Sequence, residues 1–293
     1  MKIFHWFMLA CIFCFGQLCA IKYQLSAVMI FNNEANFLRE WIEYHKLVGV
    51  EHFWLYNNNS TDNYKEVLQP YIDSGLVELT EWPSDRLEND WDHYTLGVQP
   101  AAYVNAVNRS KKKTKWLAVI DSDEYIVPVK HATVTECLNK HFKNAAGVCV
   151  NWQCYGTSYV ESIPSNKLMI ESLLYKAPKD HPKNLYYKSI VRPKYVTDCG
   201  NPHYCMYKDK YFHVNCLNQQ VGQQNNGVNI DLLRINHYWT GDRDRYYNIK
   251  IPRYMKWGHP MEMLIQWENC FNEEYDDSIL PFAEKLRKRL GMK

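Results

Sequence analysis

Between residues 25 and 80, short apolar runs alternate with segments of helical spacing, and this alternation constrains the fold more than any other feature of the sequence. Short apolar runs are typical of buried strands, whereas apolar residues that recur every three or four positions are typical of helices. Strand, helix, strand, helix and strand in succession imply right-handed βαβ units and a parallel sheet. The expected strands are 25–31, 50–56 and 76–80, and the expected helices are 37–48 and 64–71.

A fourth apolar run, residues 117–120 of KWLAVIDSDEYIVP, ends in three acids, Asp121, Asp123 and Glu124. Open α/β sheets bind their ligands at the carboxyl ends of the strands, which is where these acids fall. Side chains two positions apart in extended backbone point the same way, so Asp121 and Asp123 can face one ligand. Two adjacent carboxylates need a neutralising partner, and a hard divalent cation supplies one. The sequence therefore predicts a metal site, with a turn of solvated acids as the alternative.

The rest of the chain continues as α/β structure but is less regular. It contains no GxGxxG and no GxxxxGK[ST] pattern, which excludes the dinucleotide and P-loop sites that these motifs mark. We expect one domain over residues 21–293, with a mostly parallel central sheet flanked by helices. Its further elements are predicted as a helix at 91–113, a strand at 147–152, a loop with a short helix at 161–176, a basic strand pair at 185–196, a mobile loop at 217–229, a last strand at 230–239, a helix at 243–256 and an amphipathic segment at 281–293.

Composition narrows the class of ligand. The formal net charge is +2, from 34 basic and 32 acidic residues, so no broad nucleic-acid-binding surface is expected. Aromatic residues make up 15% of the chain, with 22 Tyr and 10 Trp. Their flat apolar faces and polar edges suit stacking on sugars or bases, although an aromatic-rich core explains the same composition.

Residues 1–20 have the pattern of an export signal. An early Lys2, an apolar run from Ile3 to Phe15 and the small Ala20 are typical of a secretory signal peptide. The segment is predicted to be cleaved after Ala20, giving a secreted or periplasmic protein, or to stay as a signal anchor that holds the protein at a membrane through residues 3–20. Both outcomes place the protein in an exported compartment.

Seven cysteines follow this segment, and they are dense between Cys199 and Cys216. In an exported protein some of them are expected to pair, which predicts a disulfide-stapled loop in that region. Because seven is odd, at least one cysteine stays free or pairs between molecules. No CxxC pair occurs outside the first 20 residues, so a cysteine zinc site is not expected.

Several motifs in combination resemble glycosyltransferase family 92. The segment NNEANFLREWIEYHKLVGV resembles the family's opening "NE…EW…YH…G" pattern, and LYNNNSTDN resembles its "YDN-x-S-x-D" turn. KWLAVIDSDEYIVP resembles its "KW…DxDEF" metal motif, YKSIVRP with His203 its "K-x-IVRP…H" segment, and INHYW its late "HY" element. The chain departs from these patterns at Asn57 and Tyr125, where the family usually has Asp and Phe, and in TGDRDRYYNIK after the HY element.

This resemblance implies a GT-A fold, with residues 21–130 as the nucleotide-binding half and residues 131–293 as the acceptor-side half. It implies an inverting glycosyltransferase that uses Mn²⁺, or Mg²⁺, and a UDP-sugar donor, with UDP-galactose as the best guess. The acceptor would be a hydroxyl of a glycan, a lipid or a protein. A divalent ion at the acids would stabilise the diphosphate leaving group as a Lewis acid and as a template.

Candidate site residues follow from these landmarks, each with a structural alternative. His237, at the end of the last strand, is the candidate third metal ligand beside Asp121 and Asp123; a core histidine is the alternative. Lys188 and Arg192 would bring positive charge to the diphosphate, or belong to a solvated basic strand. The residues expected to contact the nucleoside, or else to cap a helix, are Asn33, Glu34 and Asp62.

Inversion also requires a general base across the donor site. Glu161 and Glu171 fall in the expected region, with Asp180 less favoured. The residues do not decide among them, and Glu171 is preferred because its place at a helix start resembles that of the family's acidic residue.

Three other functions use the same residues. A metal-dependent phosphoesterase would use the acids, although such enzymes usually draw Asp and His ligands from several strand ends. A catalytically inactive glycan-binding protein would keep the fold and its aromatic residues, but it would not need the intact DSDEY acids. An exported toxin-like transferase that modifies a protein hydroxyl would share the donor site entirely and differ only in the acceptor pocket.

Overall fold

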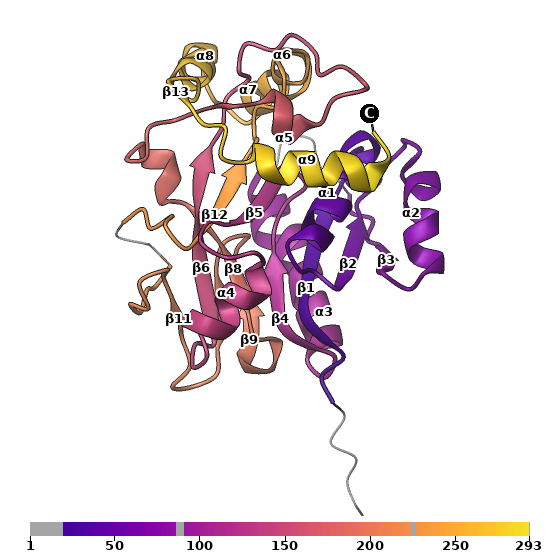
Figure 1. Ribbon diagram of the computed structural model, residues 1–293, viewed down its shortest axis with the longest axis vertical. Helices are drawn as coiled ribbons and strands as arrows, with labels where there is room; N and C mark the ends of the chain where they lie inside the picture. The colour runs from indigo at the N-terminus through magenta and orange to yellow at the C-terminus, as the bar shows by residue number, and fades with distance from the viewer. Residues whose placement is uncertain (1–19, 86–90, 224–226, 293) are drawn as a thin grey trace, which may run out of the picture.

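The computed structural model describes residues 20–85, 91–223 and 227–292, and Figure 1 shows their arrangement. The first half contains β1 (Tyr23–Phe31), α1 (Ala35–Leu47), β2 (His52–Asn57), α2 (Tyr64–Asp73), β3 (Val77–Glu81), the π-helical turn η1 (His93–Val98), α3 (Gln99–Ser110), β4 (Thr114–Val119) and β5 (Glu124–Pro128). The second half begins with α4 (Val134–His141), β6 (Gly147–Cys154), α5 (Met169–Ser172), β7 (Tyr175–Lys176), η2 (Pro182–Leu185), β8 (Tyr187–Val191), η3 (Pro193–Tyr195) and β9 (Val196–Cys199). It ends with β10 (Cys205–Tyr207), β11 (His213–Val214), β12 (Leu233–His237), α6 (Arg243–Arg245), η4 (Tyr246–Lys250), α7 (Ile251–Lys256), α8 (Met261–Cys270), β13 (Glu274–Tyr275) and α9 (Leu280–Leu290).

The central sheet has the strand order β3-β2-β1-β4-β8-β6-β12-β5, and β11 pairs with β6 outside this path. Strands β1 to β4 are parallel to one another, and β6 is parallel to β12. Strand β8 lies between β4 and β6 and is antiparallel to both, while β5 pairs antiparallel with β12 at the edge. The predicted α/β class with a mostly parallel central sheet is confirmed, and it agrees with the GT-A fold that the resemblance implies.

Two apolar layers cover the two faces of this sheet, because successive side chains of a strand point to opposite faces. On one face Leu25, Ala27 and Met29 of β1 pack with buried residues of α1, α4 and α9. On the other face Val28 and Ile30 pack against α3. Figure 1 shows α9 crossing beside α1 on the first face, and α6, α7 and α8 beyond the carboxyl ends of β6 and β12. These helices therefore border the sheet edge where the predicted ligand residues end.

The basic strand pair expected at 185–196 is wrong. Residues 187–191 form β8 of the central sheet, but Pro193 starts a 3-10 turn, and the following strand β9 pairs with β10 in a separate two-stranded sheet. A proline at that point cannot donate to a strand ladder, so the chain leaves the sheet.

The disulfide-stapled loop is confirmed, because Cys199 and Cys205 are bonded to each other. Cys216 is a buried free thiol. The described residues of the loop expected at 217–229 contain no helix or strand, and residues 224–226 lie outside the description. The export segment, residues 1–20, also lies outside it except for Ala20. Within the described ranges, no helix has the length and apolar character needed to cross a membrane.

Candidate active site

A cleft of about 870 Å³ opens at the carboxyl ends of β1, β4 and β12, between η1 and α7. This size lies within the usual range of small-molecule sites. Aromatic pairs stand on its walls: Trp152 stacks on Tyr186 with ring centroids 5.3 Å apart, and the centroids of Trp91 and Trp257 are 4.5 Å apart. Its charged and imidazole lining residues are Glu34, His93, Asp121, Asp123, His203, His237, Lys250, Arg253 and Lys256.

Helix α1 fixes the backbone of the turn that joins β4 to β5. The indole N–H of Trp41 lies 3.0 Å from the carbonyl oxygens of both Asp121 and Glu124. One turn later, His45 Nδ1 lies 2.8 Å from the carbonyl oxygen of Trp41, and burial lowers the pKa of His45 to about 3. The ring is therefore neutral and accepts the backbone N–H of Ile126 at Nε2. The EW…YH segment of α1 thus serves to position the acids.

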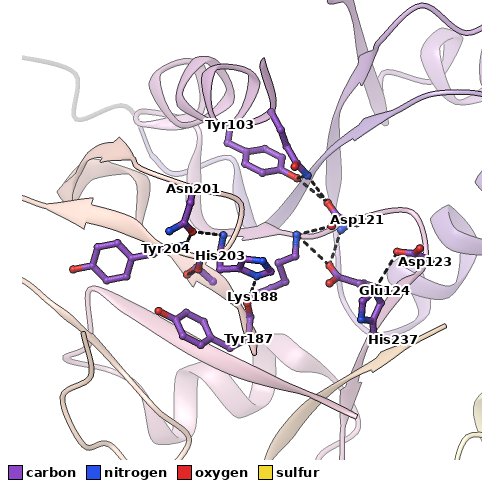
Figure 2. Close-up of polar contacts among 12 residues, drawn as sticks. Tyr103, Asp121, Asp123, Glu124, Tyr187, Lys188, Asn201, His203, Tyr204 and His237 are labelled. Atoms are coloured by element: carbon purple, nitrogen blue, oxygen red, sulfur yellow. Dashed lines mark hydrogen bonds and ion pairs between the residues drawn. The ribbon is translucent and has the colours of Figure 1, made fainter. Parts of the chain in front are cut away.

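Asp121 is bound by its neighbours on both carboxylate oxygens. Oδ1 accepts hydrogen bonds from the hydroxyl of Tyr103, at 2.8 Å, and from Nε2 of Gln99, at 3.0 Å. Oδ2 lies 2.6 Å from Nζ of Lys188, which reaches it from β8 and has no exposed surface. Figure 2 shows these contacts converging on Asp121.

Glu124, the third acid, lies beneath this turn and is fully buried. Its Oε2 accepts the backbone N–H of Asp121 at 2.7 Å and lies 3.7 Å from Nζ of Lys188, whereas its Oε1 has no hydrogen-bond partner among the described residues. Burial raises the pKa of Glu124 well above its usual range, and the charges of Asp121 and Asp123 add to this effect. Through its bond to the N–H of Asp121, Glu124 holds the turn in place from beneath.

The expectation that Asp121 and Asp123 share one face of an extended strand is wrong. The residues between β4 and β5 form a turn in which the N–H of Glu124 donates to the carbonyl oxygen of Asp121. As a result the two carboxylates bind different lysines, Lys188 and Lys250.

Asp123 and His237 lie together on the floor of the cleft. His237 Nε2 is 3.6 Å from Asp123 Oδ1, and Asp123 Oδ2 is 2.9 Å from Nζ of Lys250. Burial acts to raise the pKa of Asp123, but Lys250 and His237 outweigh it and hold this pKa well below its usual range. Asp123 is therefore ionised at neutral pH and is available to a cation.

Some of the side chains around the DSDEY turn are suitable ligands for a divalent cation, and others are not. A carboxylate oxygen and an imidazole nitrogen, from Asp123 and His237, are ligands that Mn²⁺ accepts. Asp121, by contrast, has its oxygens bound to Lys188, Tyr103 and Gln99. Within the described part of the chain, no three His, Cys, Asp or Glu side chains are close enough to hold a metal by themselves. A metal here would take its remaining ligands from water and from the substrate.

The three residues expected at the nucleoside have different environments. Glu34 lines the cleft, and its Oε1 is 2.7 Å from Nη2 of Arg245. Asn33 is exposed with φ +56°, and its Oδ1 accepts the N–H of Thr61 at 2.7 Å. Asp62 accepts the N–H of Ala35, the first residue of α1, at 2.8 Å. Asn33 and Asp62 thus tie two loops together, and only Glu34 faces the cleft.

The structure does not bring four other sequence candidates to the cleft. Arg192 donates to the carbonyl oxygen of Lys143, and its guanidinium lies 4.5 Å from the ring centroid of Trp116. Glu171 bonds the N–H of Leu168 and lies 2.7 Å from Nη1 of Arg287. Glu161 and Asp180 are exposed on the surface. None of these side chains is among the described residues that line the cleft.

Sequence reasoning missed Lys250 and assigned no role to His203, yet both line the cleft. A signal for Lys250 is present in the sequence, because Lys250, Arg253 and Lys256 recur at intervals of three and share one face of a helix. The only sequence signal at His203 is its place in the family-like segment. Its Nδ1 lies 2.8 Å from the carbonyl oxygen of Tyr187.

Comparisons with known proteins agree with these motifs. The profile of glycosyltransferase family 92 matches residues 26–274. A family 92 protein of Arabidopsis thaliana is 28% identical over 60% of this chain and 30% of its own length. One from Oryza sativa subsp. japonica is 25% identical over 90% of this chain and 44% of its length, and one from Ricinus communis is 27% identical over 66% and 33%. The chain therefore spans less than half the length of these relatives.

Among solved structures, the chain is similar to S. aureus TarS 1–349 in complex with UDP-GlcNAc, with a TM-score of 0.38 and 10% identity over 92% of this chain and 76% of that one. Glucosyl-3-phosphoglycerate synthase from Mycobacterium tuberculosis, in complex with phosphoglyceric acid, has a TM-score of 0.30 and 17% identity over 47% of each chain. Likenesses this distant carry no argument about donor or acceptor. The match of the family profile to most of the chain does decide the family: the chain belongs to glycosyltransferase family 92.

Proposed function

We propose that the chain catalyses a metal-dependent, inverting transfer of a hexose, with galactose the first candidate, from a UDP-sugar to a hydroxyl of a glycan, lipid or protein. The observation that carries this proposal is the placement of Asp123 and His237 on the floor of a cleft at the carboxyl ends of the sheet. Family membership supports glycosyl transfer, and the resemblance described above supports the UDP donor and the metal.

Asp123 and His237 would hold the divalent ion, with Asp121 at the other end of the same turn. When bound, the ion supplies Lewis-acid stabilisation of the diphosphate leaving group. The chain's own contribution is to fix this turn. Trp41 binds its two carbonyl oxygens, Glu124 binds its first N–H, and Lys188 neutralises Asp121. Such prior fixation reduces the reorganisation needed as charge develops.

The walls of the cleft suit the remaining parts of the substrates. Trp152 and Tyr186 offer stacked aromatic faces of the kind that pack on sugar rings, and Tyr186 is 48% exposed. Helix α7 contributes the cationic side chains of Arg253 and Lys256 to the lining of the cleft. The cleft thus combines apolar faces with positive charge, as a sugar linked to a diphosphate requires.

Inversion needs a group that accepts the proton of the acceptor hydroxyl. His203 is the candidate, because its Nδ1 donates to the carbonyl oxygen of Tyr187 and this tautomer leaves Nε2 as the acceptor. Burial and the nearby charge of Lys188 lower the pKa of His203 to about 4, so the ring is neutral at physiological pH. Figure 2 shows His203 held above Tyr187 and beside Lys188.

The test is binding and turnover of a panel of UDP-sugars and GDP-mannose by the purified protein, with Mn²⁺, with Mg²⁺ and with EDTA. Thermal stabilisation by a UDP-sugar that requires Mn²⁺, together with release of UDP, supports the proposal. An Asp123→Asn variant, which keeps the size of the side chain, should lose both effects. Release of inorganic phosphate without sugar transfer would indicate the phosphoesterase. Glycan binding by a protein that binds no nucleotide would indicate the inactive glycan-binding protein.

A further inference from the structure

Lys250 is a buried cation on the wall of the candidate cleft. It is the last residue of η4, a π-helical turn between α6 and α7, and π-helical turns are frequent at functional sites. Its side chain is 8% exposed, lines the cleft, and places Nζ 2.9 Å from Oδ2 of Asp123. Asp123 Oδ2 is the one acceptor within hydrogen-bond distance of Nζ among the described contacts.

Each carboxylate in the cleft has a cation of its own. Lys188 pairs with Asp121, Arg245 with Glu34, and Lys250 with Asp123. The pairs differ in where the cation lies. Lys188 has no exposed surface and lies beneath the turn, whereas Lys250 belongs to the helical wall and faces the cleft with Arg253. A divalent ion bound by Asp123 and His237 would therefore share the Asp123 carboxylate with the ammonium of Lys250.

We propose that Lys250 gives up Asp123 to the divalent ion and binds the diphosphate of the nucleotide donor. Asp123 cannot pair fully with both cations, because two like charges at one carboxylate repel each other. A buried ammonium that loses its partner is costly unless another acceptor replaces it. The diphosphate brings several acceptor oxygens and negative charge, and an ammonium on a flexible stem can follow them. Lys250 is then a donor-binding residue; this inference rests on the proposed function.

The proposal predicts that removing the charge of Lys250 changes the affinities for Mn²⁺ and for UDP in opposite directions. In Lys250→Met, Mn²⁺ alone should bind about tenfold more tightly because its competitor at Asp123 is gone. With Mn²⁺ present, UDP should bind about tenfold to a hundredfold more weakly, because a charge-assisted hydrogen bond is lost. In EDTA the UDP affinity should change little, because Lys250 then stays paired with Asp123. A purely structural lysine would not separate the two affinities in this way.

Mn²⁺ binding can be measured by the electron paramagnetic resonance signal of the free ion, and UDP binding by isothermal titration calorimetry. Lys285→Met, an exposed lysine of α9, is the control and should change neither affinity. Lys250→Gln can still donate to Asp123 but lacks the charge, so it gives the same pair of shifts if the Met variant does not fold. Lys250→Arg keeps the charge and should retain UDP binding within about tenfold.

With Mn²⁺ present, unchanged UDP affinity in Lys250→Met or Lys250→Gln would overturn this inference while the proposed function stands. Loss of UDP affinity together with loss of Mn²⁺ affinity would also overturn it, because a competitor cannot be needed for metal binding. A wild-type protein that binds neither UDP nor a UDP-sugar would instead refute the proposed function. The two failures are therefore distinguishable in one set of titrations.

Discussion

Nζ of Lys188 lies 2.6 Å from Oδ2 of Asp121, and the lysine side chain has no exposed surface. Burial alone would lower the pKa of Lys188, but Asp121 and Glu124 outweigh it and raise this pKa above its ordinary value. The lysine is thus charged and shared between two acids of the DSDEY turn. Its positive charge offsets the negative charge of the turn and so stabilises the turn inside the fold.

Replacing Lys188 with methionine is expected to lower the free energy of unfolding by about 3–5 kcal/mol, because it leaves buried acids without their cation. Urea denaturation measures this loss. Lys288→Met removes a surface ion pair with Glu284, in which both side chains are at least 70% exposed, and should cost less than about 1 kcal/mol. A Lys188→Met protein as stable as the Lys288→Met control would refute a structural role for the buried pair.

Glu40 predicts a pH dependence of stability. This buried carboxylate of α1 accepts the backbone N–H groups of Met169 and Ile170, and burial raises its pKa to about 7 from 4.5. Between these two values the folded protein binds more protons than the unfolded chain, so stability falls as pH rises through this window. In the wild type, Glu40 should account for a loss of about 3 kcal/mol between pH 4.5 and pH 8.

A Glu40→Gln variant should lack this loss. The free energies of unfolding of the two proteins should therefore change in parallel at low pH, separate between about pH 4.5 and pH 7, and keep a constant difference above that window. Glu43, on the same helix, is the matched control. Burial acts to raise its pKa, but Lys46 and Arg289 outweigh this effect and lower it. Glu43 therefore adds stability that is lost as pH falls. The difference in free energy of unfolding between wild type and Glu43→Gln should accordingly change with pH in the direction opposite to that for Glu40→Gln. Parallel pH profiles for wild type and Glu40→Gln would show that Glu40 titrates normally.

His203→Ala should reduce turnover of the donor by about a hundredfold to ten-thousandfold while UDP affinity stays unchanged, because a general base acts on the acceptor and not on the nucleotide. Release of UDP under saturating donor measures the rate, and calorimetry measures the affinity. His93→Ala, at another imidazole of the cleft, serves as the control and should keep most of the rate. Equal rates in wild type and His203→Ala would exclude His203 as the base.

His237→Ala should weaken Mn²⁺ binding at least about tenfold, because it removes the proposed nitrogen ligand beside Asp123. Equilibrium dialysis with Mn²⁺ gives the affinity without any need for an acceptor. Asp180→Asn, at an exposed acid outside the cleft, should leave the affinity unchanged. If both variants bind Mn²⁺ as the wild type does, His237 belongs to the core and not to a metal site.

The elements of the parallel half could be predicted from sequence to within a few residues, because the strands and helices between residues 23 and 81 have clear periodicity and glycine ends. The second half offers fewer such signals. Strands β7, β11 and β13 have only two residues each, too few to show alternation. Charge and composition between residues 185 and 196 predict a strand pair, but they do not reveal the turn at Pro193 that separates the two strands.

Site residues could be predicted from the sequence only where a single continuous segment contains the pattern that identifies them. Asp121 and Asp123 follow an apolar strand and could be placed at a sheet edge, but their lysine partners lie 67 and 127 positions away. No local pattern specifies such pairings. Glu171 is a case in which the local prediction holds but the site assignment does not. It lies in the short helix α5, as expected, but it pairs with Arg287 of α9 and does not line the cleft.

The antiparallel strand β8 also has a consequence for the order in which the protein is made. Because β8 carries Lys188 into the sheet between β4 and β6, Asp121 leaves the ribosome 67 residues before the lysine that neutralises it. The early part of the chain can form its βαβ units while it is synthesised, but its acid turn stays incomplete until the second half is in place. A translation product that stops before residue 188 would therefore contain the acids without the lysine that neutralises Asp121.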